Sequence, residues 1–173
     1  KRAVVQSPRS SPLPSGPAVA LKAHRLSSGA TVIVRRETAV PLFAIRATWP
    51  GGLRLEHPEI NGTTALLART LCRGSEGCSA EQLSQQLDAL CGGLSTVPGR
   101  SSFSLRAEFL ARHFDDAFAL FSRVARQPAF DPREVERERG RQLDDIRSRD
   151  DRPASVAFEL FANDVASNRL PES

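Results

Sequence analysis

Several residue types are scarce or missing in this chain of 173 residues. It has no methionine, no tyrosine and a single tryptophan, and aromatic residues make up only 6% of the sequence. A chain so poor in aromatic side chains has no platform on which nucleic acid bases could stack. Its 24 basic and 20 acidic residues are intermixed, so the net charge of +4 is not gathered into one cationic stretch. Together these features argue against a nucleic acid partner.

Long apolar segments are missing as well. No run approaches the roughly 20 apolar residues that a transmembrane helix needs, and no signal peptide opens the chain. The sequence therefore predicts no transmembrane segment, and either the cytoplasm or the periplasm of a bacterium is compatible with it. Because methionine is absent even at position 1, we expect a processed chain or a piece of a longer polypeptide.

The few cysteines and histidines form no recognisable site. Cys72, Cys78 and Cys91 match neither a zinc ribbon nor a redox pair, so we expect free thiols that are buried or half-buried. The three histidines lie far apart, and no two have the spacing of metal ligands within one element. A nucleophile elbow, a P-loop and a Rossmann fingerprint are also absent. The common sequence signatures of hydrolases and nucleotide-binding proteins are therefore missing.

The first 19 residues differ in composition from the rest. Residues 6–19 (QSPRSSPLPSGPAV) set prolines among serines and a glycine, which is typical of an extended, solvated tether. From residue 20 onward, apolar residues recur with the periods of helices and strands. We therefore predict a Pro/Ser-rich linker at 1–19 and a single domain at 20–173.

The periodicity within that domain predicts an α+β fold, in which helices cover an antiparallel sheet. Strands are expected at 31–36, 41–49, 93–97 and 102–110. Helices are expected at 61–72, 79–90, 114–124 and 133–152, with a fifth formed by Val156, Leu160, Phe161 and Val165.

Caps and apolar stripes add detail to three of these helices. Asn61 or Thr63 is expected to cap the first, and Ser79 with Gln82 predicts a capping box for the second. The third carries a stripe of Phe114, Ala117, Phe118, Phe121 and Val124. The helix at 133–152 is mostly charged, so it should lie on the surface, with a narrow inward seam of Val135, Leu143 and Ile146.

Five short motifs occur in a recognisable order. They are LSSGATVIV from Leu26, GGLRLE at 51–56, NG at 61–62, CSAEQLSQQLDALCGGLS from Cys78 and QPAFDPREVERERGRQLDDIRSRDDRP from Gln127. Together they resemble the amino-terminal half-domain of the pitrilysin or insulinase-type zinc metallopeptidases, the family that includes the mitochondrial processing peptidase subunits. The resemblance covers about residues 26–153. Because the family's domain continues beyond a point like Ser173, it implies a half-domain truncated at its C-terminus.

Active members of that family carry the motif His-x-x-Glu-His on the helix that follows the glycine. Two histidines at positions i and i+4 face the same way and bind zinc, and the glutamate activates water. Aligned on this sequence, the histidine positions fall on Ala65 and Arg69 and the glutamate position on Ala68. The resemblance therefore implies a degenerate, inactive domain with no metal site and no cofactor of its own.

Two further family positions are altered. The third zinc ligand is a glutamate seven residues after the glutamate of a Glu-Arg pair; counted from the pair at 138–139, it falls on Asp145. An aspartate can bind zinc, but alone it cannot hold a catalytic ion. The strand that pairs with peptide substrate corresponds to Ser95, Thr96 and Val97, and its first two residues stand where the family has Asn-Ala.

The resemblance and its departures predict a non-catalytic homologue domain of a zinc metalloendopeptidase. Such a domain would close the peptide chamber and support a catalytic half-domain in the same or a partner chain. Its expected partners are that catalytic half-domain or subunit, which alone would carry zinc, and an unfolded peptide substrate. One alternative is a purely structural scaffold, like a core subunit, without peptide binding. Another is a hydrolase that uses residues outside this sequence.

Overall fold

The computed structural model describes residues 21–150, 153, 156–157 and 160–161. The chain divides into two compact units between Val40 and Pro41. In the first, β1 (Leu21–Arg25) pairs antiparallel with β2 (Thr31–Arg35). The predicted strand at 31–36 is therefore confirmed, and β1 is a strand that the sequence did not reveal. The predicted linker lies outside the described residues.

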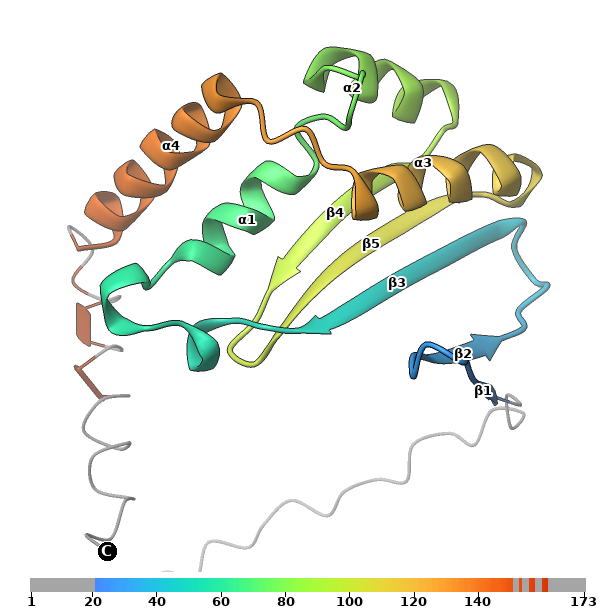
Figure 1. Ribbon diagram of the computed structural model, residues 1–173, viewed down its shortest axis with the longest axis horizontal. Helices are drawn as coiled ribbons and strands as arrows, with labels where there is room; N and C mark the ends of the chain where they lie inside the picture. The colour runs from blue at the N-terminus through green and yellow to red at the C-terminus, as the bar shows by residue number, and fades with distance from the viewer. Residues whose placement is uncertain (1–20, 151–152, 154–155, 158–159, 162–173) are drawn as a thin grey trace, which may run out of the picture. The chain divides into compact units, whose positions relative to one another are not determined.

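The second unit contains a three-stranded antiparallel sheet with the order β3-β5-β4 (Figure 1). Its strands are β3 (Leu42–Pro50), β4 (Gly93–Pro98) and β5 (Ser102–Leu110). The long central strand β5 pairs with β3 from Leu42↔Leu110 to Pro50↔Ser102, and with β4 from Gly93↔Glu108 to Pro98↔Phe103. These three strands agree with the predicted ones within a residue or two at either end.

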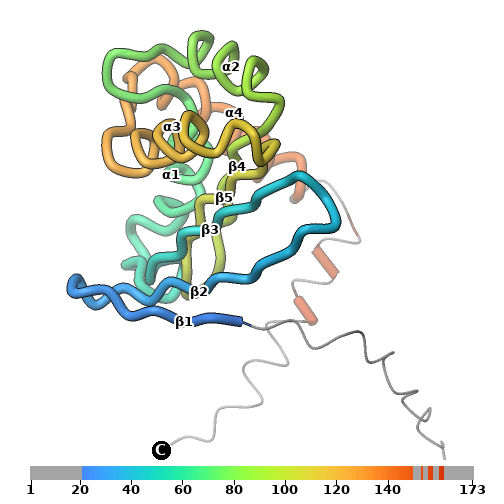
Figure 2. Tube along the Cα trace, turned by 90° about the vertical axis from the view of Figure 1, so that its right-hand side faces the viewer, coloured from blue at the N-terminus to red at the C-terminus, as the bar shows by residue number. Residues whose placement is uncertain are grey.

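One face of this sheet forms the core of the unit. Apolar and polar residues alternate along the sequence of β5, which predicts one buried face. The apolar positions Phe103, Leu105, Ala107 and Phe109 are buried as expected, but the polar Ser104 is buried as well. Opposite them on the other face, Arg106 and Glu108 of the same strand are exposed. The helices lie over the apolar face (Figures 1 and 2).

Four α-helices cover the apolar face or pack beside it. They are α1 (Thr63–Leu71), α2 (Ala80–Ala89), α3 (Phe114–Arg126) and α4 (Pro132–Asp150). Three single-turn 3-10 helices accompany them: η1 (Leu53–Leu55), η2 (Pro58–Ile60) and η3 (Ala111–His113). α1 and α2 pack on β4, α3 packs on β5, and α4 packs on α1. The prediction of an antiparallel sheet covered by helices is thus confirmed.

The inward faces of two helices differ from those predicted. In α3 the buried stripe is Ala117, Leu120, Phe121 and Val124, whereas Phe114 and Phe118 are 49% and 44% exposed and stack on each other. In α4 the predicted apolar seam is wrong for Leu143 and Ile146, which are each 40% exposed. Glu138 and Asp145 lie on that side instead, where they pair with Arg73 and Arg69.

The chain beyond α4 is described only at single positions. Pro153, Val156, Leu160 and Phe161 are helical, whereas Val165 of the expected fifth helix lies outside the described residues. Over the described part of the chain, no helix is both long and apolar enough to cross a bilayer.

Gly92 lies in the short connection between α2 and β4, close against β5. A β-carbon at this position would lie 2.0 Å from Cδ1 of Phe109 and 2.4 Å from the carbonyl oxygen of Glu108. Only glycine therefore lets β4 leave α2 in register with the core strand β5. A β-carbon placed on the neighbouring Gly93 would have no other atom within 4 Å.

Candidate functional site

Helix α1 carries the residues that the family resemblance singled out, and a glutamate before it fixes its N-terminus. Glu56 accepts hydrogen bonds from the backbone N–H groups of Gly62 and Thr64, each at 2.6 Å. The expected caps are wrong: the N-cap is Gly62, with φ +102° and no side-chain cap. Thr63 instead donates its hydroxyl to the carbonyl oxygen of Ile60.

The same contacts perturb the Glu56 carboxyl. Hydrogen bonds from the Thr64 side chain and from the backbone of Gly62 and Thr64 hold its pKa below its ordinary value. A carboxylate at this place also meets the positive end of the helix dipole. The start of α1 is therefore anchored by a charge that lies outside the helix itself.

The structure brings two of the predicted site positions into direct contact. Arg69 of α1 donates from Nη2 to Oδ2 of Asp145 on α4, although the two residues are 76 positions apart in the sequence. Ala68 is buried beside Arg69, and Ala65 is half-buried one turn earlier. Ala65 lines a separate, small hollow of about 290 Å³ against Leu53 and the β4–β5 turn.

A second cluster of ion pairs joins Arg73, just beyond the C-cap of α1, to Glu138, about two turns before Asp145 on α4. The side chain of Glu138 is only 3% exposed, and its Oε1 lies 2.8 Å from a guanidinium nitrogen of both Arg73 and Arg141. Arg141 also donates a hydrogen bond to it. At the other end of the interface, Gln142 donates to the carbonyl oxygen of Gly62 at 3.2 Å. The contacts between α1 and α4 named here are thus polar along the length of α1.

The strand residues that were predicted to pair with peptide lie beside α1. Thr96 donates its hydroxyl to the carbonyl oxygen of Ala68 at 2.5 Å, which ties β4 to the helix. Ser95 and Thr96 both line a groove of about 520 Å³ between α1, α2 and β4. Val97 is not among the residues that line it and is 37% exposed. Within the described sheet, β4 is an outer strand, with β5 on one side only.

The cysteines are free thiols, as predicted, but they differ in exposure. Cys78 is buried and Cys72 half-buried, whereas Cys91 is exposed, contrary to the prediction. Burial raises the pKa of the Cys72 thiol to about 11, against the smaller opposing effect of the Arg73 charge. Cys72 lines the groove, yet its thiol stays neutral near pH 7, so it is a poor nucleophile there.

No metal-binding cluster is found among the residues that the structure describes: no three His, Cys, Asp or Glu side chains lie suitably close together. The imidazole of His57 lies beside its neighbour Glu59, whose backbone N–H is 3.5 Å from Nδ1, and both side chains are exposed. Sequence reasoning singled out neither Glu56 nor the burial of Glu138. The position of Glu138 seven residues before Asp145 places the two on the same side of α4, and this spacing was the available signal.

Comparison with known proteins gives the family. Residues 33–173 match the insulinase family, peptidase family M16, so this chain belongs to that family. It is similar to the uncharacterized zinc protease YmxG of Bacillus subtilis, with 23% identity over 149 residues that cover 86% of this chain. An uncharacterized zinc protease of Rickettsia bellii is also 23% identical, over 82% of the chain. The resemblance stated from the sequence motifs is thus confirmed.

Solved structures share the fold. The peptidase M16 inactive domain from Pseudomonas fluorescens superposes with a TM-score of 0.74 at 18% identity, over 80% of this chain. A protease from Helicobacter pylori gives 0.71 at 14% identity, also over 80%. The chain covers 36% and 34% of the two curated relatives and 34% and 33% of these two structures, which is about a third of their length.

Proposed function

We propose that this chain is a non-catalytic half-domain of an M16 peptidase, which helps to enclose a peptide and supports a catalytic half-domain in the same or a partner chain. The observation that carries the proposal is the pairing of Arg69 with Asp145. This ion pair occupies the place where the family resemblance predicts a histidine and an acidic zinc ligand.

The side chains at this place do not fit a zinc ion. Alanines at 65 and 68 offer no ligand atom, and the guanidinium of Arg69 is itself a cation with no free acceptor. Asp145 is the one remaining donor of the four positions, and Arg69 already binds it. A catalytic zinc site needs three protein ligands and a water, so the metal and the hydrolytic step belong to the proposed partner.

Peptide binding is the part of the role that β4 supports. An extended peptide can add a strand to the outer side of β4 and receive main-chain hydrogen bonds there, while side chains enter the groove. The family assigns this task to the strand that here contains Ser95, Thr96 and Val97. Loss of the metal leaves this mode of binding intact, because it uses backbone groups and not the metal.

The test separates three roles. The 173-residue chain alone is expected to cleave no unfolded peptide, and its addition to the catalytic M16 half-domain from the same source is expected to raise cleavage by that half. A peptide with all its central amides N-methylated has no N–H to donate along either edge, so it is expected to bind more weakly than its unmethylated form. Cleavage by the chain alone would overturn the proposal. Enhanced cleavage without peptide binding would favour the structural scaffold.

A further inference from the structure

Two arginines line the groove between α1, α2 and β4, one from α1 and one from the residues just after it. The charged residues that line it are Arg69, Arg73 and Glu138. Arg69 lies in the last turn of α1 and Arg73 just beyond its C-cap, Cys72. Both side chains line the groove. Their side chains are 34% and 39% exposed. A ligand in the groove can therefore reach both guanidinium groups.

The acidic partners of these arginines are placed very differently. Glu138 is buried and shares its carboxylate between Arg73 and Arg141, so this charge is fully engaged within the protein. Asp145, the partner of Arg69, has a side chain that is 65% exposed, and it is not among the residues that line the groove. The partner of Arg69 is thus an exposed carboxylate outside the groove, and water can readily replace Arg69 as its hydrogen-bonding partner.

An exposed ion pair of this kind is readily exchanged. Such pairs contribute little to stability, because water and salt compete with them. Arg69 contacts Asp145 through one nitrogen, Nη2, whereas a guanidinium has five N–H donors. An acidic group that arrives through the groove can therefore make the contact that Asp145 makes. Release of Asp145 then costs little free energy, because water hydrates its exposed carboxylate.

We propose that Arg69 is a receptor for a side-chain carboxylate of an extended peptide in the groove, with Asp145 as the internal competitor for it. The inference rests on the proposed function, from which it takes the peptide beside β4. It adds a substrate class: peptides with an aspartate or glutamate next to Ser95 and Thr96 bind more tightly than neutral peptides of the same shape. Because Asp145 competes for Arg69, it lowers the affinity of the chain for these acidic peptides.

Binding of matched peptides to the 173-residue chain tests the inference. Two fluorescent, unstructured peptides with blocked ends differ only by Glu against Gln at one central position. Fluorescence anisotropy is expected to show about tenfold tighter binding of the acidic peptide, falling with added salt. Arg69→Gln should remove this preference, and Asp145→Asn should strengthen binding of the acidic peptide several-fold. Arg69→Lys, which keeps the charge but loses the planar fork, should retain part of the preference.

Matched controls separate contact from long-range charge. Asp144→Asn removes the same charge one residue away, from a pair with Arg147 in which both side chains are more than 70% exposed. It is expected to leave both affinities unchanged. Circular dichroism of each variant checks that the fold is retained.

Equal effects of Asp145→Asn and Asp144→Asn would overturn the inference, because the change would then be one of net charge alone. Equal binding of both peptides would overturn it as well, while peptide binding itself, and with it the proposed function, would stand. Failure of both peptides to bind would overturn the inference and also the peptide-binding part of the proposed function.

Discussion

At the scale of single residues, Glu56 does what a cap within the helix usually does. It lies in the segment between β3 and α1 and accepts two backbone N–H groups of the first turn of α1. The sequence pointed to Asn61 or Thr63, because capping rules relate a helix only to its immediate neighbours. A residue six positions before the cap reaches the helix only through the turn at η2, and no local rule describes that turn.

Replacement of this carboxylate gives a pH-dependent prediction. The pKa of Glu56 is lowered in the fold, so its contribution to stability is fully present above the unfolded value near 4.5 and is lost as pH falls through the folded pKa. Glu56→Gln is expected to lower the free energy of unfolding by about 1 kcal/mol at pH 7, the usual size of a helix cap. Urea unfolding across pH 2 to 8 should show the variant and the parent converging in acid.

Glu59→Gln is the control for this change, because the Glu59 side chain is 86% exposed and lies in the same segment. It should unfold like the parent at neutral pH. A constant difference between Glu56→Gln and the parent at every pH would contradict the role of the carboxylate charge.

Glu138 is the other residue whose environment the sequence did not reveal. It looked like one more charge on a surface helix, yet its side chain is 3% exposed and binds two arginines. Removal of one member of a buried pair leaves the other charge without its partner. Because both arginines keep access to water, we expect Glu138→Gln to cost about 1 to 3 kcal/mol, less than a fully buried pair would lose.

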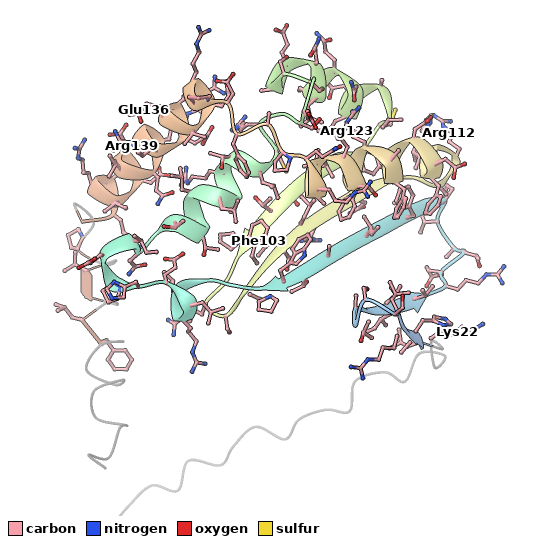
Figure 3. The ribbon with its side chains drawn as sticks, in the orientation of Figure 1. Lys22, Phe103, Arg112, Arg123, Glu136 and Arg139 are labelled. Carbon is pink, nitrogen blue, oxygen red and sulfur yellow. The ribbon has the colours of Figure 1, made fainter. Side chains whose placement is uncertain are left out.

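The matched control is Glu136→Gln, two residues away on the exposed side of α4, where Glu136 receives two hydrogen bonds from Arg139 (Figure 3). Both side chains there are more than half exposed. Urea unfolding should not distinguish this variant from the parent. Equal losses for both glutamates would mean that Glu138 is not a buried anchor.

At the scale of elements, the sequence specifies strands and most helices well, and helix contacts less well. The alternation along β5 and the capping box of α2 are local patterns. The structure confirms the capping box and the buried apolar positions of β5, although the polar Ser104 is buried too. The inward side of α4 depends on α1, which is more than 60 residues earlier in the chain. Apolar spacing pointed to Leu143 and Ile146, but Glu138 and Asp145 face this side instead. They pair with Arg73, just after α1, and with Arg69 of α1.

The joint between α2 and β4 provides a prediction at this scale. Gly92→Ala would place its β-carbon inside the contact distance of the Phe109 ring. Overpacking against a core aromatic should cost about 1 to 3 kcal/mol. The β-carbon of Gly93→Ala would enter open space, so this variant should change the free energy of unfolding by less than about 0.5 kcal/mol. Thermal unfolding of the pair checks this, and similar melting temperatures for both would show that β4 shifts freely.

At the scale of the whole molecule, the functional interpretation depends on one long-range register. Arg69 and Asp145 must be the positions at which the family places a histidine and its third ligand, and the structure does bring them together. Spacing on α1 could be predicted from the sequence, because i and i+4 lie on one side of a helix. The contact between Arg69 on α1 and Asp145 on α4 could not be predicted from periodicity. Its prediction rested on the family resemblance.

That register can be tested by building the missing ligands. Ala65→His and Arg69→His place two imidazoles on one side of α1, and Asp145→Glu supplies a longer carboxylate from α4, so that three ligands and a water complete a catalytic-type zinc shell. The triple variant is expected to bind about one zinc per chain, roughly 10- to 100-fold more weakly than an evolved site, because residues that orient the ligands are not provided. Competition with a zinc-binding dye measures this, and the parent chain should compete no better than buffer.

Two controls accompany the triple variant. One combines both histidines with Asp145→Ala, and the other moves the histidines to Leu66 and Thr70, which turns them about 100° around the helix. Equal uptake by the triple variant and the Asp145→Ala control, in chains that keep the parent circular dichroism, would show that α4 does not contribute to this place and that the register is wrong.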